Sequence, residues 1–208
     1  MPLISLSRLS LMREAPPLIY LARHGETAWS VSGQHTGRTD LPLTAQGEEN
    51  ARRLGRRLAG LAFAQVLTSP LARARRTCEL AGFAAVASID QDLLEWDYGA
   101  YEGMTPEQIR GERPGWEIFR DGCPGGESLA EVAGRADRVA ARLRAASAKV
   151  LVFSSGHLLR VLAARWLGFD GALGRYLFLD TAALSVLGYQ RSFAEPVIRL
   201  WNDCRHLE

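Results

Sequence analysis

The stretch Leu18-Ile19-Tyr20-Leu21-Ala22-Arg23-His24-Gly25-Glu26-Thr27 decides the fold that we expect for this chain. Its first five residues are mostly apolar, which is typical of a buried strand. The strand ends abruptly in Arg23-His24-Gly25, and open α/β sheets bind their ligands at the carboxyl ends of strands. Gly25 allows a sharp turn and a close approach of the backbone to a bound group. The stretch predicts a strand whose end carries residues for chemistry. An equally supported interpretation is a strand followed by a polar turn in which Arg and His are adjacent by chance.

An imidazole beside a fixed cation suits attack on a phosphoryl group. Arg23 would hold the anion, and its charge also disfavours protonation of the His24 ring. A ring nitrogen is then left free as a nucleophile. His24 is therefore a candidate nucleophile, and Arg23 is a candidate phosphate-binding residue.

Composition indicates one globular domain and excludes several classes of protein. The 208 residues are 47% hydrophobic and 23% charged, which suits one domain with a full core. A net charge of +2, without a basic run interleaved with aromatic residues, argues against nucleic-acid binding. The sequence contains no run of 18 apolar residues, so no membrane-spanning helix is predicted. Three scattered cysteines argue against a disulfide framework or a Cys-x-x-Cys metal site and favour a reducing cytoplasm: Cys78, Cys123 and Cys204.

Strand and helix patterns alternate along the rest of the chain. We expect a loosely held N-terminal tail over residues 1–17 and one domain over residues 18–208. Alternation predicts an α/β fold, a three-layer α/β/α sandwich with a mostly parallel central sheet and a site at the carboxyl ends of its strands. The expected strands lie near residues 18–22, 64–68, 84–89, 149–154, 182–190 and 197–201. The expected helices lie near 44–60, 69–80, 128–146 and 157–167, with a polar loop at 30–43 and irregular chain at 92–126.

Capping residues mark several helix starts. A guanidinium one turn inside a helix can reach the positively polarised start of that helix and grip phosphate with two parallel hydrogen bonds. Arg73 has this position in the helix near 69–80, whereas Arg75 and Arg76 are interpreted as solvated surface charges. The capping residues are Thr44, the pair Ser69-Pro70, and Ser128 with Glu131.

Two later segments add candidates for catalysis. Between Asp92 and Gly103, four carboxylates lie among aromatic residues and glycines, and a carboxyl group with apolar walls can protonate a leaving oxygen. We choose Glu95 for this role, the alternative being that these acids pair with the abundant arginines. Phe153 to Arg160 forms another strand end that feeds a helix start. Because the neighbouring strand ends already indicate an anion site, His157 becomes a candidate although such a histidine is more often a capping residue.

Together these motifs resemble the histidine phosphatase superfamily, the phosphoglycerate mutase-like group. The resemblance covers about residues 18–205 and implies that His24 is transiently phosphorylated, with Arg23 and Arg73 binding the phosphoryl group. It implies that Glu95 acts as an acid and then as a base for water, and that no metal or organic cofactor takes part. The segments that look most like broad-specificity acid phosphatases and sugar bisphosphatases are 33–40, 95–103 and 121–128.

Two positions depart from the pattern of that superfamily. Ser30 stands where Asn is usual, and it can still hydrogen-bond a phosphate oxygen. Ser155 stands where similar members have the second catalytic histidine, a loss that costs roughly 10²–10³ in rate by analogy with a missing preorganised donor. Either His157 turns inward to compensate, or Ser155 weakens the enzyme, or the protein no longer catalyses. The candidates are His24, Glu95, His157 and Ser155 for catalysis, and Arg23, Arg73, Ser30, Thr36, Gly37 and Gly156 for phosphate binding.

The expected function is hydrolysis of small phosphorylated metabolites such as sugar phosphates, by a cytoplasmic monomer or homodimer. A phosphoglycerate mutase is the first alternative, but a mutase needs extra basic residues for the substrate carboxylate. The segment after Gly99 offers few, namely Arg110 and Arg113. A phosphate-binding protein without activity is the alternative of another class, motivated by Ser155. Charge and hydropathy favour neither nucleic acid nor membrane as a partner.

Overall fold

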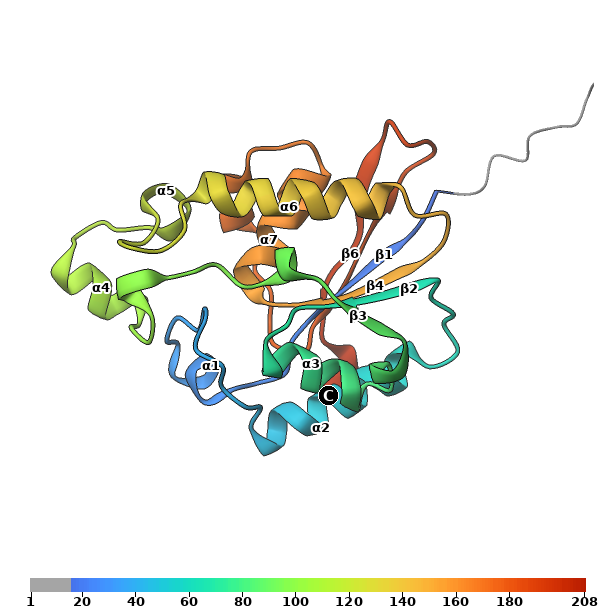
Figure 1. Cartoon of the computed structure of the whole chain (residues 1–208), viewed down its shortest axis with the longest axis horizontal. Helices are drawn as coiled ribbons and strands as arrows, with labels where there is room; N and C mark the ends of the chain where they lie inside the picture. The colour runs from blue at the N-terminus through green and yellow to red at the C-terminus, as the bar shows by residue number, and fades with distance from the viewer. Residues whose placement is uncertain (1–15) are drawn as a thin grey trace, which may run out of the picture.

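A six-stranded sheet in the order β3-β2-β4-β1-β5-β6 runs through the middle of the molecule (Figure 1). The computed structural model describes residues 16–208, so the tail expected over residues 1–17 lies almost wholly outside the described residues. Strands β1 to β4 pair in parallel, whereas β5 is antiparallel to β1 and β6 to β5. The mostly parallel α/β sheet is therefore confirmed. The strands are β1 Ile19–Arg23, β2 Gln65–Thr68, β3 Ala87–Ile89, β4 Val150–Ser154, β5 Leu184–Tyr189 and β6 Pro196–Asp203.

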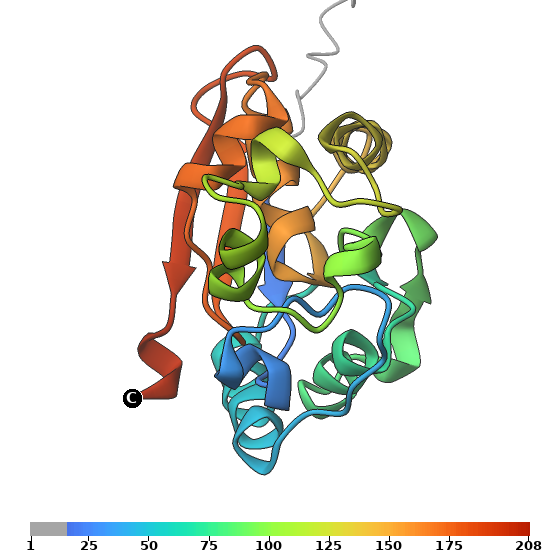
Figure 2. The ribbon, with the colours of Figure 1, turned by 90° about the vertical axis from the view of Figure 1, so that its left-hand side faces the viewer.

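Helices cover both faces of the sheet, as the three-layer prediction requires. In Figure 1, α2 and α3 lie below the sheet, and α6 and α7 lie above it. Figure 2 looks onto the end of the sheet where the short helices α1, α4 and α5 lie. No helix within residues 16–208 is long and apolar enough to cross a membrane. The helices are α1 Ala28–Ser32, α2 Ala45–Leu58, α3 Ala72–Leu80, α4 Pro106–Glu112, α5 Ile118–Asp121, α6 Leu129–Arg144 and α7 Gly156–Trp166; the 3₁₀ turns are η1 Ala84–Val86, η2 Gln91–Leu93, η3 Gly99–Tyr101, η4 Gly171–Tyr176 and η5 Arg205–Leu207.

Strand β4 is fully buried and divides the core into two halves. Val150 and Val152 pack in the half covered by α6 and α7. Leu151 and Phe153 face the opposite half, where the apolar stripe of α2 packs. Successive side chains of a strand point to opposite faces, so a central strand with helices on both sides must be apolar throughout. The continuous apolar run that predicted this strand has that cause.

Most of the predicted helix boundaries hold, but the start of α3 does not. Thr44 caps α2 by accepting the Gly47 N–H, and Ser128 and Glu131 form the expected capping box of α6. The pair Ser69-Pro70 was predicted to open α3, yet the helix begins at Ala72. The reason is that the Ser69 N–H still donates to a β4 carbonyl, which keeps this residue in the sheet ladder. The Ala72 N–H is capped instead by the carboxylate of Asp40, at 2.7 Å.

Two other predictions were wrong in detail. The strand expected over residues 84–89 is a 3₁₀ turn followed by the short strand β3. Residues 92–126, expected to be irregular, contain α4 and α5, and α1 extends into the loop expected at 30–43. These helices have four to seven residues, which is too short for an apolar repeat to reveal them. They matter because they stand beside the carboxyl ends of the strands.

Candidate active site

A cavity of about 420 Å³ opens at the carboxyl ends of β1 and β4. Its walls come from the strand ends, the N-terminus of α7, and the loops that carry α1, α4 and α5. The sequence predicted a site at the carboxyl ends of the strands, and most of the predicted candidate residues lie around this cavity. Of the ten predicted site residues, seven line the cavity: Arg23, His24, Ser30, Thr36, Glu95, Gly156 and His157.

His24 lines this cavity and is buried, with only 3% of its surface exposed. Its backbone N–H donates to the Ser154 carbonyl, which holds it against the end of β4. The ring Nδ1 lies 2.8 Å from the Gly25 carbonyl oxygen. Burial lowers the pKa of His24 well below 6.5, and the nearby charges of Arg73 and Arg23 lower it further. The ring is therefore neutral at neutral pH.

Arg23 and Arg73 lie close enough to His24 for their charges to lower its pKa, and backbone carbonyls hold both guanidinium groups, although only Arg23 lines the cavity. Arg23 donates to the Leu179 carbonyl at 2.6 Å. Arg73 is fully buried and donates to the carbonyls of Thr36, Gly37 and Thr39. The Nε of each arginine is buried, without a hydrogen-bond partner among residues 16–208. Buried donors are normally paired, so two unpaired ones beside His24 suit an anion.

Glu95 lies against the first turn of α7. Its Oε2 accepts the His157 N–H at 3.0 Å, and its Oε1 accepts the N–H groups of Leu158 and Trp96, both at 2.9 Å. Glu95 occupies the N–H groups of residues 157 and 158, and it pairs with no arginine among the described residues.

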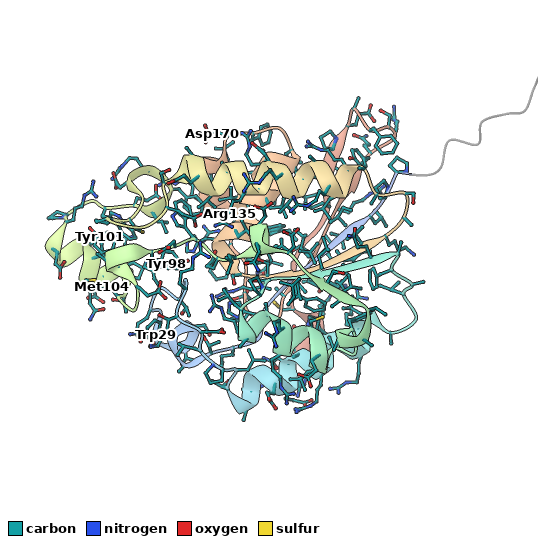
Figure 3. The ribbon with its side chains drawn as sticks, in the orientation of Figure 1. Trp29, Tyr98, Tyr101, Met104, Arg135 and Asp170 are labelled. Carbon is teal, nitrogen blue, oxygen red and sulfur yellow. The ribbon has the colours of Figure 1, made fainter. Side chains whose placement is uncertain are left out.

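A buried arginine of α6 fixes the backbone that carries Glu95. Arg135 points from α6 toward the segment before Glu95 (Figure 3). Its guanidinium donates to the carbonyls of Asp92, Leu94 and Glu95 and pairs with Glu127 at 2.7 Å. The other acids of the predicted cluster have different partners: Asp92 pairs with arginines of α6, Asp97 pairs with Arg38, and Glu102 accepts the N–H groups of Gly37 and Thr39. The structure therefore distinguishes Glu95 from the acids around it.

His157 turns toward the cavity and packs among aromatic rings. Its ring centroid lies 5.4 Å from that of Phe119 and 6.2 Å from that of Trp96. Its Nδ1 lies 2.7 Å from the hydroxyl of Tyr98. Burial, followed by the charge of Arg160, lowers the pKa of His157 well below 6.5. Burial also raises the pKa of Tyr98 well above 10, so its hydroxyl keeps its proton.

The remaining predicted residues lie near the cavity but differ in what they can contact. Ser155 is fully buried outside the cavity lining, and its hydroxyl has no partner among residues 16–208. Gly37 is also outside the lining, and its N–H donates to Glu102. Ser30 lines the cavity, but its hydroxyl donates to the Thr27 carbonyl and accepts the Thr27 N–H in the capping box of α1. Gly156 leaves room for Arg23, because a Cβ there would lie 3.3 Å from its Nε.

Sequence reasoning missed several residues of the cavity wall. Tyr98 was visible in the segment around Glu95, but nothing in the pattern showed that its hydroxyl meets His157. In Figure 3, Trp29 and Tyr98 come from separate segments at the same end of the molecule. His35 stacks on Tyr98 at 4.5 Å, and burial lowers its pKa to about 4. Arg160 follows His157 by three residues on α7, a helical spacing that could have indicated a shared face.

Comparison with known proteins agrees with this geometry. Residues 19–204 match the sequence model of the Histidine phosphatase superfamily (branch 1), and the chain belongs to this family. The chain is 42% identical to an acid phosphatase of Mycobacterium tuberculosis, covering 86% of this chain and 90% of that protein. It is 38% identical to sedoheptulose 1,7-bisphosphatase of Saccharomyces cerevisiae, covering 76% and 70%. A solved structure of a Mycobacterium tuberculosis open reading frame superposes with a TM-score of 0.84 at 37% identity, covering 89% and 97%. The protein is thus an enzyme of the phosphatase class of hydrolases.

Proposed function

We propose that this enzyme hydrolyses phosphomonoesters of small metabolites through a phosphohistidine formed on His24. The contact between its Nδ1 and the Gly25 carbonyl carries the proposal. A carbonyl oxygen only accepts hydrogen bonds, so we assign the ring proton to Nδ1. In a neutral imidazole the other nitrogen, Nε2, then holds a lone pair. That lone pair is the nucleophile, and the lowered pKa keeps it free of a proton at neutral pH.

Arg23 and Arg73 bind the transferring phosphoryl group in this proposal. Their fixed positions support it, since carbonyl groups hold each guanidinium before any substrate arrives. Donors that need no reorganisation stabilise developing charge more effectively than mobile ones. The carbonyls of Thr36 and Gly37 then act by positioning Arg73, and Gly156 acts by leaving space for Arg23.

The reaction proceeds in two steps. The His24 Nε2 attacks phosphorus, the bond from phosphorus to the ester oxygen breaks, and the leaving oxygen takes a proton from the Glu95 carboxyl group. Glu95 Oε2 suits this role because it accepts one backbone N–H, whereas Oε1 accepts two. In the second step Glu95 takes a proton from water, the water oxygen bonds to phosphorus, and the bond to Nε2 breaks. Inorganic phosphate leaves and the neutral imidazole is restored.

His157 supplies the second imidazole that Ser155 does not. The Tyr98 hydroxyl keeps its proton and meets Nδ1 of His157, so we assign Tyr98 as the donor and Nδ1 as the acceptor. The ring proton then lies on Nε2, where it can be donated to a phosphoryl oxygen. Of the three alternatives raised by Ser155, this one, in which His157 compensates, is supported by the position of His157 in the cavity wall.

The setting of the reaction forms part of the same proposal. The enzyme acts in the cytoplasm as a monomer or homodimer, on small phosphorylated substrates and without nucleic acid, membrane, metal or organic cofactor. Mutase activity is a second candidate, because the cavity wall is more basic than the sequence indicated. Arg113 pairs with Asp121, but Arg110 is joined in the wall by Arg160 and Arg175.

Hydrolysis of an aryl phosphate by the purified full chain tests the proposal. We expect the protein to release phosphate. We also expect mass spectrometry of the enzyme during turnover to detect a phosphoryl group on His24. Substitution His24→Ala should abolish both signals. Activity that survives this substitution would refute the mechanism. Faster interconversion of 2- and 3-phosphoglycerate than hydrolysis of either would favour the mutase, and binding without turnover would favour an inactive protein.

A further inference from the structure

The loop of residues 36–40 holds Arg73 from two sides. The Arg73 guanidinium donates to three carbonyls of this loop at 2.8 to 3.0 Å, those of Thr36, Gly37 and Thr39. The carboxylate of Asp40 accepts the N–H of Ala72, the first residue of α3, so the loop also caps the helix that carries Arg73. The position of Arg73 therefore depends on the position of this loop.

Glu102 holds the loop in turn. Residues 36–40 belong to no helix or strand, so the loop depends on contacts with other segments. Glu102 directly follows η3, and its Oε1 accepts the N–H groups of Gly37 at 2.8 Å and of Thr39 at 3.1 Å. Hydrogen bonds to a carboxylate are about twice as strong as those between neutral groups. One side chain from a distant segment thus fixes the backbone of the loop at two points.

The peptide group between residues 36 and 37 lies between the two charged side chains. Its N–H, on Gly37, donates to Glu102, and its carbonyl, on Thr36, accepts from Arg73. The N–H and C=O of a trans peptide point in opposite directions, so the two side chains approach this group from opposite sides. Hydrogen bonds arranged in such a chain polarise and strengthen one another. Glu102 can therefore act on Arg73 without contacting it.

This indirect arrangement leaves part of the guanidinium free. Within residues 16–208, Arg73 donates only to backbone carbonyls, and its Nε has no partner. A carboxylate in direct contact would occupy donors that a phosphoryl group needs. Burial lowers the pKa of Arg73, and nearby negative charges, that of Glu102 among them, oppose this shift. Glu102 thus supports the charge and the position of Arg73 while its Nε stays available.

Close packing restricts the loop to one position beside Glu102. A Cβ at Gly37 would lie 2.6 Å from Glu102 Oε2 and 2.6 Å from the Trp96 carbonyl oxygen, so only a glycine fits there. Just before the loop, the backbone of His35 exchanges two hydrogen bonds with residues 103–104, each of 2.9 Å. The segment that follows η3 therefore determines where the loop lies, and Glu102 is its side-chain contact with the part that holds Arg73.

We propose that Glu102 is a positioning residue for the reaction, which fixes the loop of residues 36–40 and, through the carbonyls of that loop, holds Arg73 where the phosphoryl group binds. This inference rests on the proposed function, since it takes Arg73 as a phosphate-binding residue. Glu102 does not line the cavity, so it acts through the loop and not by contact with the substrate. Its two hydrogen bonds to the loop are the contacts that the experiments must change.

Three substitutions of Glu102 separate its reach from its charge. Glu102→Ala should lower kcat/KM of the full chain for an aryl phosphate by roughly 10- to 100-fold, the effect of a misplacement of about 1 Å. Glu102→Gln keeps an acceptor oxygen at the same reach and should lose less than about 5-fold. Glu102→Asp keeps the charge but falls short of the loop, so it should lose about as much as the alanine variant. A glutamine variant as poor as the alanine variant, or an aspartate variant equal to the parent, would overturn the proposal.

A double-mutant cycle tests whether Glu102 acts through Arg73. Arg73→Met removes the side chain that the loop holds, and circular dichroism checks that the variant folds. If Glu102 acts only through Arg73, adding Glu102→Ala to Arg73→Met should lower kcat/KM by less than about 3-fold further, because residues of one network are not additive. Additive losses would show that Glu102 supports the fold in general and does not position Arg73.

Glu195 provides a matched control at the other end of the sheet. Its Oε2 accepts the N–H of Arg191 at 3.1 Å in the turn between β5 and β6. Because β5 is antiparallel to β1, this turn lies away from the carboxyl end of β1. Glu195→Ala also deletes a carboxylate that accepts a loop N–H, and it should change kcat/KM by less than about 2-fold. A loss equal to that of Glu102→Ala would mean that the effect of Glu102 is not specific to Arg73.

Binding of inorganic phosphate separates failure of this inference from failure of the proposed function. Calorimetry gives the Kd of inorganic phosphate for the parent, Glu102→Ala and Glu102→Gln without any turnover. A Kd at least about 10-fold higher in the alanine variant, but close to that of the parent in the glutamine variant, supports the positioning role even if no ester is hydrolysed. Equal Kd values in the three proteins overturn it even if the parent hydrolyses the aryl phosphate.

Discussion

The ends of β1 and β4 look alike in sequence but are built differently. They are neighbouring parallel strands, Arg23 pairs in register with Ser154, and each strand is followed by a glycine and a histidine. The Nδ1 of His24 meets a carbonyl, which only accepts, whereas the Nδ1 of His157 meets a hydroxyl, which can donate. The first ring is left with a lone pair on Nε2, and the second can present an N–H. Under the proposed function, the partner of one ring nitrogen would therefore give two similar strand ends opposite chemical roles.

The two glycines differ in the same way. A Cβ on Gly25 would lie 2.5 Å from the Gly47 carbonyl oxygen, which is backbone of α2 and cannot move alone. A Cβ on Gly156 would lie 3.3 Å from atoms of the Arg23 side chain. The backbone of α2 therefore excludes a side chain at Gly25 after β1, whereas the Arg23 side chain in the site restricts one at Gly156 after β4.

Removing each imidazole should give the largest contrast between the two strand ends. We expect His24→Ala to lower kcat for an aryl phosphate by about 10⁴-fold or more, because it deletes the proposed nucleophile. His157→Ala should lower it by about 10²–10³-fold, the usual cost of one preorganised donor. Steady-state kinetics measure both values, with circular dichroism as the control for folding. Equal losses would mean that the two rings do not have the different roles assigned here.

Ser155→His sharpens that result. Because His157 already lines the cavity, we expect this substitution to change kcat of the parent by less than about 10-fold, well below the usual cost of a missing donor. In the His157→Ala background the same substitution should restore part of the lost rate. A large gain in the parent would show instead that Ser155 leaves an unfilled place and that His157 does not compensate.

Adding a methyl group to each glycine should separate stability from activity. Gly25→Ala should lower the free energy of unfolding by about 2–3 kcal/mol, since the new Cβ overlaps backbone. Gly156→Ala should change stability by less than about 1 kcal/mol, but it should lower kcat/KM by roughly 10-fold by displacing Arg23. Urea unfolding and steady-state kinetics on the same samples give both numbers. A stable Gly25→Ala protein would contradict the close packing of β1 against α2.

Protonation of the His24 and His157 rings should give the smallest difference between the two strand ends, because we expect both rings to respond to pH in the same way. Burial lowers the pKa of His24 and of His157 well below 6.5. At pH 5.5 an ordinary histidine is about 90% protonated, whereas we expect both of these rings to stay neutral. Ring nitrogen NMR signals followed from pH 7.5 to 5 measure this directly. A midpoint near 6.5 for either ring would contradict its burial.

The same shifts make stability depend on pH. Below about pH 6.5 the unfolded chain takes up protons on these histidines and the folded chain does not. The free energy of unfolding should therefore fall as the pH decreases from 6.5 toward the folded pKa values, and these rings contribute no change above that range. His157→Gln should show a weaker decrease in urea unfolding than the parent over the same range.

The sequence predicted the sheet well because its signals are local. The capping box of α6 is a contact between residues three positions apart. The apolar run of β4 reflects the position of that one strand between two layers of helices. The start of α3 was mispredicted because Asp40, which caps it, lies 32 residues away. Helices α4 and α5 were not predicted because they are short. The part of the cavity wall that contains Phe119 was therefore not predicted either.

Within the site, the sequence alone proposed candidates at strand ends or in the segments that follow them: His24, Arg23, Arg73, Glu95 and His157. Strand ends in a parallel sheet meet at one edge, so this much follows from order along the chain. Only the tertiary structure decided what each polar atom contacts, because those contacts join segments far apart in sequence. Tyr98 reaches His157 across 59 positions, and Glu95 takes the N–H groups of α7 across more than 60. A hydrogen bond depends on distance and direction in space, and these are set only when the packed elements bring the two segments together.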